Sequence, residues 1–212
     1  MKAPGKDRLL SEVAAYYSDK LAEHVESPRG VDWNGEEGQS LRFEQLCKIV
    51  APHASFSIND LGCGYGALLD FIESQHVDVT YCGLDVSASM VDAAKKRYAG
   101  RRGIRFACVG EPDEVADYGV ASGIFNVRQG QADSEWRAYM ERTLDCLDKT
   151  SRMGFSFNCL TAYSDTEKMR DYLYYADPGA WFDFCKRRYS RNVALLHDYG
   201  LYEFTILVRK QI

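Results

Sequence analysis

The segment best suited to do chemistry is a turn in which three glycines alternate with other residues, directly after an apolar stretch. The turn reads Asp60-Leu61-Gly62-Cys63-Gly64-Tyr65-Gly66. Glycines where a strand turns into a helix allow a tight turn and let a ligand approach the backbone closely. The spacing Gly62-x-Gly64-x-x-Ala67 also satisfies the dinucleotide fingerprint, so the glycines alone leave the kind of nucleotide open. A glycine-rich turn without a ligand is the less favoured alternative.

Asp60 helps to decide between ligands. It lies two residues before the first glycine, at the end of the expected strand. A carboxylate here repels the pyrophosphate of a dinucleotide. S-adenosylmethionine has no phosphate and is net cationic, because it carries an ammonium and a sulfonium against one carboxylate. Such a ligand suits Asp60, directly or through a water, and a helix N-cap is the less favoured role.

Asp85 is the second candidate anchor. It lies 19 residues after Gly66, at the end of the next expected strand. An acid about 20 residues beyond the glycines can accept hydrogen bonds from ribose hydroxyls. It can also cap the helix that begins near Ser87, and both roles can hold together.

The elements that position these residues follow from hydrophobic periodicity and from turn signals. We expect helices at 9–25, about 37–50, 67–74, from Ser87 to Tyr98, from Ser134 to Leu147 and from Pro178. We expect strands at 55–61, 77–84, 104–109, 119–125, 153–159, 193–197 and 202–208. Pro52 ends the second helix, Ser87 and Ser134 are predicted caps, and Pro178 is the predicted first helical residue.

Strands that alternate with helices predict an α/β fold with a doubly wound, mostly parallel sheet of seven strands. The last two strands are joined by residues 198–201. Four residues cannot hold a crossover helix, so this C-terminal pair must be an antiparallel hairpin. A chain of this length predicts a single domain, 1–212, in which helices at 1–52 precede a core at 53–212.

Composition limits the classes of function. The chain has 212 residues, of which 46% are hydrophobic and 27% charged, as in globular proteins. No apolar run is long enough for a membrane span or a signal peptide. The seven cysteines show no pairing pattern, which agrees with a cytoplasmic protein. The four histidines are scattered, so no metal site is predicted. The net charge of −5 disfavours a nucleic-acid partner, and the basic residues at 186–191 are interpreted as a solvated helix end.

The turn at 60–66, followed by Gly83-Leu84-Asp85-Val86-Ser87, resembles motifs I and II of the class I S-adenosylmethionine-dependent methyltransferases. The resemblance covers about 56–209. It implies a Rossmann-like fold, an N-terminal helical lid and S-adenosylmethionine as cofactor. The whole chain, including 155–160 and 197–202, is similar to uncharacterised bacterial methyltransferases of the small-molecule type, which suggests no particular acceptor.

The resemblance also implies roles for individual residues. Gly62, Cys63 and Gly64 lie in the motif against the methionine part, Asp85 binds the ribose, and Val86 and Met90 flank the adenine. Glu111 follows the third strand, where the family often has an acid or amide near the adenine amino group. Asn126 follows the fourth strand, where the family often places a polar residue facing the methyl group, and it is our catalytic candidate. Met90 as a core residue, and Glu111 and Asn126 as plain loop residues, are the alternatives.

The segments outside the sheet must form the acceptor pocket. In the N-terminal segment Tyr16, Tyr17, Trp33 and Arg42 are candidates, and Arg42 could pair with the methionine carboxylate or be a surface residue. The segment 161–179 is rich in tyrosine, which more often packs than reacts. His197 and Tyr199 at the hairpin turn are more readily structural than catalytic, although a histidine can act as a base near neutral pH.

These observations predict methyl transfer to a small-molecule acceptor by direct displacement at sulfur, and they leave the acceptor and the oligomeric state open. The chain lacks the Asn-Pro-Pro-Tyr or Asp-Pro-Pro-Tyr signature of methyltransferases acting on bases and glutamine. An RNA or protein methyltransferase is the first alternative and needs a basic groove beside Asn126. A nicotinamide-dependent oxidoreductase and a non-catalytic binding module are the others.

Overall fold

The computed structural model describes residues 4–24, 26–27, 35–51, 55–75 and 78–210. Seven strands form one sheet in the order β3-β2-β1-β4-β5-β7-β6. The strands are β1 (Phe56–Leu61), β2 (Val79–Asp85), β3 (Ile104–Cys108), β4 (Ala116–Ala121), β5 (Ser151–Leu160), β6 (Asn192–Leu196) and β7 (Glu203–Arg209). Strands β1 to β5 are parallel, whereas β7 is antiparallel to both β5 and β6. The predicted α/β sheet with a C-terminal antiparallel hairpin is therefore confirmed.

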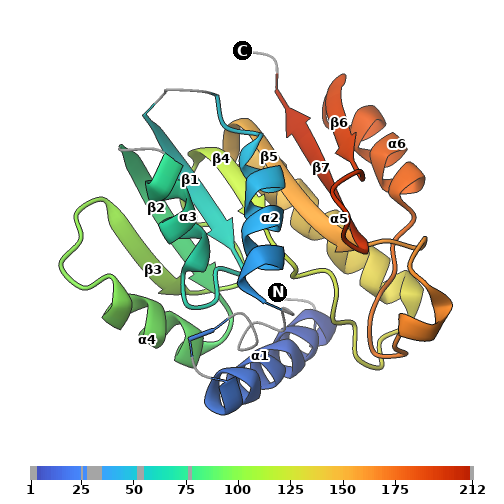
Figure 1. Cartoon of the computed structure of the whole chain (residues 1–212), viewed down its shortest axis with the longest axis horizontal. Helices are drawn as coiled ribbons and strands as arrows, with labels where there is room; N and C mark the ends of the chain where they lie inside the picture. Colours follow the sequence, from blue (N-terminus) through green and yellow to red (C-terminus); the bar gives the residue numbers. More distant parts are fainter. Residues whose placement is uncertain (1–3, 25, 28–34, 52–54, 76–77, 211–212) are drawn as a thin grey trace.

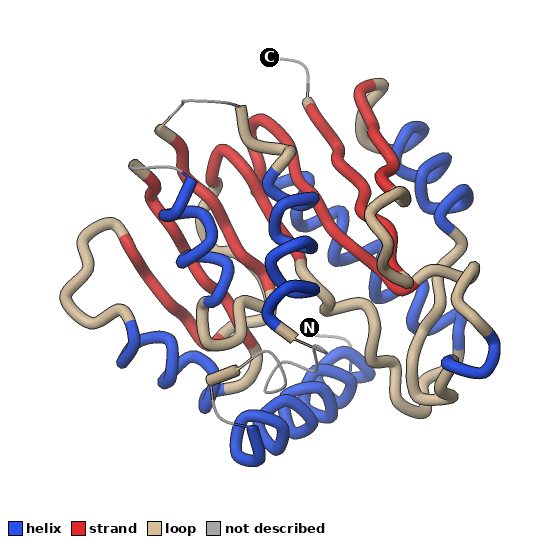
Figure 2. Tube along the Cα trace, viewed as in Figure 1, coloured by secondary structure: helices blue, strands red, loops and turns tan. Residues whose placement is uncertain are grey.

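Helices cover both faces of the sheet (Figures 1 and 2). They are α1 (Pro4–His24), α2 (Glu36–Cys47), α3 (Ala67–Gln75), α4 (Ala88–Arg97), α5 (Asp133–Lys149) and α6 (Pro178–Arg188), with a short 3₁₀ turn η2 at Thr166–Lys168. Residues of α2, α3 and α4 share one apolar core with one face of the strands, and residues of α5 and α6 share a second core with the other face. In Figure 1, α1 lies across the edge toward which β1 points. It therefore lies at the carboxyl ends of the parallel strands, where α/β folds bind ligands.

Helix α5 shows how spacing produces burial. Trp136, Tyr139, Met140, Leu144 and Leu147 recur at helical intervals, and all five are buried.

Two of the three predicted helix starts are confirmed. The Ser87 hydroxyl accepts a hydrogen bond from the Met90 amide at 3.3 Å, and Pro178 opens α6 behind the N-cap Asp177. The predicted Ser134 cap is wrong. Helix α5 begins at Asp133, and its N-cap is Ala132, which makes no side-chain hydrogen bond.

The fourth strand also differs from its prediction. It spans Ala116–Ala121 rather than 119–125. Its first half includes Asp117, whose carboxylate accepts hydrogen bonds from the Ser57 amide and from Arg152 across the neighbouring strands. The strand ends before Gly123, which has a φ of +74°. Ser122 therefore lies just beyond the strand, at the edge where ligands bind, rather than within the sheet.

Candidate functional site

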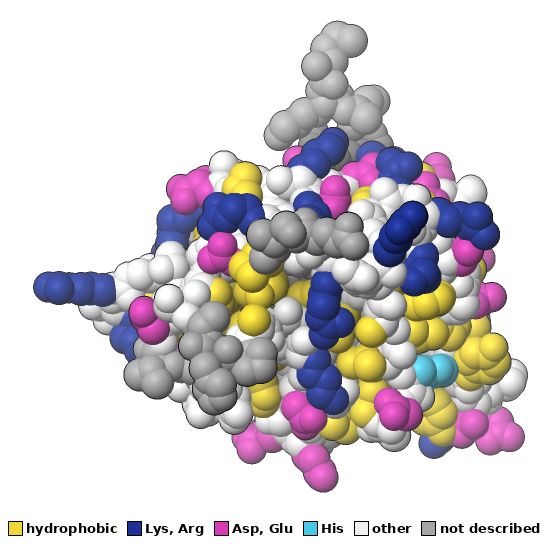
Figure 3. Space-filling view, turned by 90° about the horizontal axis from the view of Figure 1, so that it is seen from above, with side chains coloured by type: hydrophobic (Ala, Val, Ile, Leu, Met, Phe, Trp, Pro, Cys, Tyr) yellow, Lys and Arg dark blue, Asp and Glu magenta, His cyan; other side chains and the backbone are white. Residues whose placement is uncertain are grey.

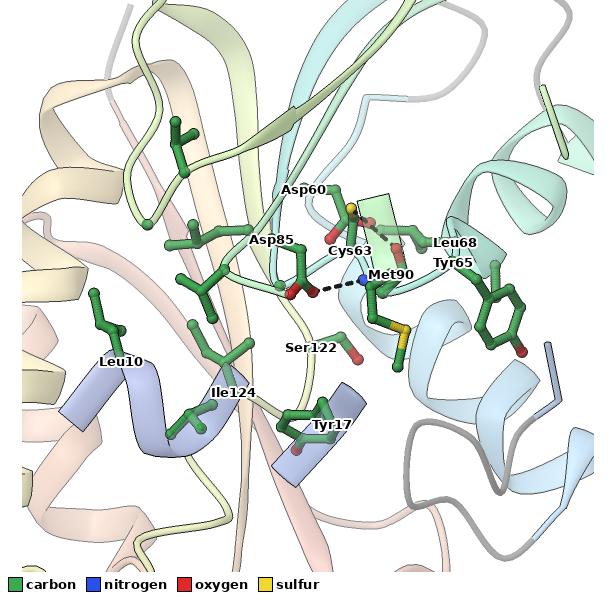
Figure 4. Close-up of a pocket in the computed structure, with 18 of the residues that line it drawn as sticks. Leu10, Tyr17, Asp60, Cys63, Tyr65, Leu68, Asp85, Met90, Ser122 and Ile124 are labelled. Atoms are coloured by element: carbon green, nitrogen blue, oxygen red, sulfur yellow. Dashed lines mark hydrogen bonds between the residues drawn. The ribbon is translucent and has the colours of Figure 1, made fainter. Parts of the chain in front are cut away.

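A cavity opens at the carboxyl ends of β1, β2 and β4, beneath α1 (Figure 4). Its lining comes from α1, α2, the ends of β1 and β2, the glycine turn, the start of α3, the start of α4 and the loops after β3 and β4, together with one side chain of α5. The lining residues are Leu10, Val13, Tyr17, Gln39, Phe43, Asp60, Leu61, Gly62, Cys63, Gly64, Tyr65, Ala67, Leu68, Asp85, Val86, Met90, Val109, Gly110, Ser122, Ile124 and Tyr139. In Figure 4, Leu10 and Tyr17 of α1 lie opposite Asp60 and Asp85 at the strand ends.

The glycine turn is held by its own backbone. The Gly62 and Cys63 amides both donate to the Leu84 carbonyl, at 2.7 and 3.1 Å, and the Gly66 amide donates to the Cys63 carbonyl. Gly62 has a φ of +80°, and a Cβ atom there would lie 2.0 Å from Cγ2 of Ile124. Only glycine fits this position, because both the backbone angle and the neighbouring side chain exclude a larger residue. The turn is thus rigid, and its amides are already bound.

Asp85 joins the glycine turn to helix α4. Its Oδ2 accepts a hydrogen bond from the Gly64 amide at 2.9 Å, and its Oδ1 accepts one from the Ser87 amide at 2.8 Å. Burial raises the pKa of this carboxyl, while the backbone hydrogen bonds oppose that shift. Each carboxylate oxygen can accept more than one hydrogen bond, so Asp85 keeps acceptor capacity for a ligand.

Asp60 is more deeply buried, with 1% of its surface exposed. Its Oδ2 accepts a hydrogen bond of 2.5 Å from the Tyr81 hydroxyl, whereas its Oδ1 has no partner in the structure. Burial raises the pKa of Asp60 to about 7, against the lowering effect of the Tyr81 hydrogen bond, and the nearby Asp85 raises it further. A buried carboxylate oxygen without a partner is rare unless a ligand supplies one. The chemistry it calls for is a cationic donor, such as an ammonium group.

The cavity lining combines polar and apolar side chains. Asp60, Ser122 and Gln39 are among the polar residues, and the buried Ser122 hydroxyl also lacks a partner. Val86, Val109 and Ile124 are among the apolar residues. Such a lining suits a ligand that carries both a charged group and an apolar part.

Comparison with known proteins identifies the family. A family described as "Methyltransferase domain" matches residues 59–152. The Mycobacterium tuberculosis protein named "Putative methyltransferase Rv1506c" is 63% identical over 163 residues, which are 77% of this chain and 98% of that protein. The chain therefore belongs to the methyltransferase family of this relative.

Solved structures share the fold of this methyltransferase at low sequence identity. N-methyltransferase NodS from Bradyrhizobium japonicum, solved with S-adenosyl-L-homocysteine, has a TM-score of 0.66 at 14% identity and covers 94% of this chain and 98% of its own. A SAM-dependent methyltransferase from Leishmania major has a TM-score of 0.65 at 16% identity, with coverages of 95% and 83%. The DhpI–SAH complex has a TM-score of 0.63 at 15% identity, with coverages of 95% and 96%.

The structure brings most of the sequence-predicted site residues of this methyltransferase together. Eight of them line the cavity, and they come from α1, the two strand ends, the glycine turn and α4. They are Tyr17, Asp60, Gly62, Cys63, Gly64, Asp85, Val86 and Met90. Burial, followed by the charges of Asp85 and Asp60, raises the pKa of the Cys63 thiol well above its ordinary value. Cys63 is therefore a neutral thiol in the cavity lining and not a nucleophile.

Three predicted residues of this methyltransferase do not line the cavity. The buried Arg42 donates from Nε to Glu203 Oε2 at 2.9 Å. Asn126 is buried too, and its Oδ1 accepts a hydrogen bond from the Leu160 amide at 3.1 Å, which ties the loop after β4 to β5. Glu111 is exposed, although its neighbours Val109 and Gly110 line the cavity. Trp33 lies outside the described residues.

The hairpin residues are also outside the lining. His197 is exposed, with its ring 5.8 Å from that of Tyr163 and 6.2 Å from that of Phe204. The Tyr199 hydroxyl shares a hydrogen bond with the Thr205 hydroxyl, and burial raises its pKa. These contacts agree with the structural role favoured for both residues.

Sequence reasoning missed Ser122, Ile124, Tyr139 and Gln39. Ser122-Gly123 is a turn signal. Ending the fourth strand at this turn would have placed Ser122 and Ile124 in the loop beyond the strand, and so among the candidate site residues. Tyr139 and Gln39 lie on helices at positions that look like ordinary core or surface, so no local signal distinguishes them.

No three histidine, cysteine, aspartate or glutamate side chains in the part of the chain that the structure describes converge on a point that would suit a metal ion. Within the same residues, none of the helices combines the length and apolar character that crossing a membrane requires.

Proposed function

We propose that the protein binds S-adenosylmethionine in this cavity and transfers its methyl group to a small-molecule acceptor. The observation that carries the proposal is Asp60, a buried carboxylate in the cavity lining with an unpartnered Oδ1. A cationic amino group supplies what this atom lacks. The membership of a methyltransferase family makes the amino acid part of S-adenosylmethionine the natural source of that group.

Different residues of the chain would bind different parts of the cofactor. Asp60 faces the methionine ammonium, and Asp85 accepts hydrogen bonds from the ribose hydroxyls. Val86 and Met90 pack against the adenine, and Leu10 and Tyr17 of α1 cover it. When bound, S-adenosylmethionine supplies a methyl group on a sulfonium that is already activated toward nucleophiles.

The contribution of the protein to the reaction is positioning. Among the described residues that line the cavity, none is a histidine or a lysine. Holding donor and acceptor in line can supply much of the acceleration without a strong base. We assign residues 1–52 the role of a lid on a single domain, since both α1 and α2 contribute lining side chains.

The charge distribution supports a small acceptor rather than a nucleic acid. Arg187 and Arg188 of the basic segment pair with Asp183 and Asp145, and Lys186 donates to the Arg191 carbonyl. On the face shown in Figure 3, basic side chains are interspersed with acidic ones instead of forming a continuous patch. Phosphate binding needs clustered cations that are free to release counterions. Seven free thiols also fit a reducing compartment such as the cytoplasm.

A nicotinamide dinucleotide fits the site poorly. Anion binding at a glycine turn uses free backbone amides, whereas those of Gly62, Cys63, Gly64 and Gly66 all donate within the protein. Asp60 would also repel a pyrophosphate.

Calorimetry with S-adenosylmethionine, S-adenosylhomocysteine and NAD tests the proposal. We expect both sulfur nucleosides to bind and NAD not to bind. Transfer of a labelled methyl group to a panel of small amines, alcohols and thiols, with bulk RNA and protein as comparisons, then tests the acceptor class. Binding of NAD alone would overturn the cofactor, and labelling of RNA or protein alone would overturn the acceptor.

A further inference from the structure

The buried tyrosine beside Asp60 has no role in the function proposed so far. Tyr81 lies on β2 with 1% of its surface exposed, and its hydroxyl donates to Asp60 Oδ2 at 2.5 Å. Its ring packs against that of Phe106 at a centroid distance of 5.7 Å. Neither the glycine turn nor the ribose acid requires a phenol at this position, and a phenylalanine would fill the same space.

We propose that Tyr81 is a positioning residue for the cofactor: it holds one oxygen of Asp60 and thereby directs the other oxygen, in ionised form, at the methionine ammonium. The inference rests on the proposed function. The hydrogen bond occupies Oδ2 and restricts rotation of the carboxyl group, while Oδ1 is left without a partner. A donor hydrogen bond also favours the charged form of a carboxylate, which burial opposes.

The surroundings of Asp60 make its ionisation depend on few groups. Tyr81 and Asp85 face it from β2, Cys63 from the glycine turn and Cys47 from the end of α2. Burial raises the pKa of Cys47 to about 12 and that of Cys63 well above its ordinary value, so both thiols are neutral near pH 7. The Tyr81 phenol is neutral as well, because burial raises its pKa. Asp85 is the remaining charge, and it opposes ionisation of Asp60.

This arrangement makes cofactor affinity depend on pH. With its pKa raised to about 7, Asp60 in the ligand-free protein is largely protonated at pH 6. A cationic ligand binds the ionised form, so binding at pH 6 must release a proton from Asp60, and affinity must fall as the pH falls below 7. Loss of the Tyr81 hydroxyl raises the pKa of Asp60 further and moves that decline to higher pH.

Tyr81→Phe tests the inference, with affinities measured by calorimetry from pH 6 to 8.5. We expect binding of S-adenosylmethionine at pH 7 to weaken roughly tenfold, with the decline displaced upward by about one pH unit. The matched control is Tyr118→Phe, which removes the hydroxyl of another buried strand tyrosine whose partner, the Ala51 amide, is outside the cavity lining. It should leave both affinity and pH profile unchanged.

A second ligand separates this inference from the proposed function. 5′-Methylthioadenosine has the nucleoside but no amino acid, so its affinity should be the same in the native protein and in Tyr81→Phe at every pH. Failure of the native protein to bind either ligand would remove the proposed function. Binding of both ligands with an unchanged pH profile in Tyr81→Phe would remove only the role of Tyr81.

Proton release by the native protein provides a measurement that needs no variant. Calorimetry at pH 6 in buffers of different ionisation enthalpy should show release of roughly one proton with S-adenosylmethionine and none with 5′-methylthioadenosine. Equal proton release for the two ligands would overturn the inference.

Discussion

Ionised Asp60 destabilises the ligand-free protein, because a buried charge without a full set of partners loses more hydration than it regains. One hydrogen bond from Tyr81 offsets part of that loss, and Oδ1 has no partner. A residue of this kind persists where a ligand compensates it. Asp60 therefore links fold stability and function within a single side chain.

Asp60→Asn should stabilise the ligand-free protein at pH 8. The folded-state pKa of about 7 lies above the ordinary value of 3.8, so the folded protein holds a proton that the unfolded chain releases between pH 4 and 7. Stability must therefore fall as pH rises through that window. We expect the variant to exceed the native free energy of unfolding by about 1–3 kcal/mol at pH 8. Urea denaturation measures the difference, which should shrink toward pH 4.

Asp85→Ala should weaken cofactor binding about tenfold or more, which is about 1.4 kcal/mol. The change removes the proposed acceptor for the ribose and also the acceptor of the Gly64 and Ser87 amides. Calorimetry on a variant whose circular dichroism matches the native protein provides the measurement. Native affinity in such a variant would contradict the ribose role.

Gly62→Ala should abolish cofactor binding. It should also lower the free energy of unfolding by more than backbone strain alone would. Gly62 and Gly100 have similar φ angles, +80° and +78°, but a Cβ at 62 meets Ile124 at 2.0 Å whereas one at 100 meets nothing within 4 Å. Gly100→Ala is thus the matched control, with a cost of about 1–2 kcal/mol from the left-handed conformation alone. Urea denaturation of both variants should show the larger loss for Gly62→Ala. Equal losses of unfolding free energy would mean that the loop after β4 moves to accommodate the new methyl group.

At the scale of elements, a buried polar network joins helix α2 to two strands and to the loop after β4. Glu203 on β7 accepts hydrogen bonds of 2.9 Å from Arg42 on α2 and from Asn158 on β5. Asn158 in turn accepts one of 2.7 Å from the Gly123 amide, beyond β4. Gly123 lies between Ser122 and Ile124, which both line the cavity. The network therefore holds the loop that closes one wall of the site.

Arg42→Ala should destabilise the protein by about 3 kcal/mol, because it leaves Glu203 as a buried charge without its cation. The side chains of this pair are 11% and 1% exposed. Arg187→Ala breaks the Arg187–Asp183 pair, whose side chains are 78% and 59% exposed, and should change the free energy of unfolding by no more than about 0.5 kcal/mol. Chemical denaturation of the two variants compares the pairs directly. Similar losses would show that the buried network contributes little.

At the scale of the molecule, the cavity joins both apolar cores of the sheet. Phe43 and Leu68 belong to the core under α2, α3 and α4, whereas Leu61 and Tyr139 belong to the core under α5 and α6. Helix α1 adds Leu10 and Val13 from across the strand ends. A ligand in the cavity would therefore contact residues of both cores and of α1.

S-adenosylhomocysteine should stabilise the whole fold and protect α1 in particular. At a hundredfold excess over its Kd, binding adds about 2.7 kcal/mol to the free energy of unfolding and raises Tm by roughly 5–10 °C. Hydrogen exchange should slow in α1 and in the glycine turn, but not in the β6–β7 hairpin. Unchanged exchange in α1 beside a protected glycine turn would show that this helix does not cover the ligand.

Features that depend on local chemistry could be predicted from the sequence. Glycines after an apolar strand predict a ligand turn, an acid at the next strand end predicts a ribose anchor, and a four-residue connection predicts an antiparallel hairpin. Each of these depends on neighbouring residues, whose geometry the backbone restricts to a few conformations. The antiparallel pairing of β6 with β7 and the family confirm the hairpin and the methyltransferase class, while the ribose role of Asp85 stays a prediction.

Only the tertiary structure decided which side chains meet. Arg42 lies 161 residues from Glu203, and Asp60 lies 21 residues from Tyr81 on a different strand. No local spacing encodes such contacts, because they depend on strand order, on register and on the direction in which each side chain leaves its element. For that reason Arg42 and Asn126 looked like site residues but bind other parts of the fold, while Gln39, Tyr139 and Tyr81 were recognised only in the tertiary structure.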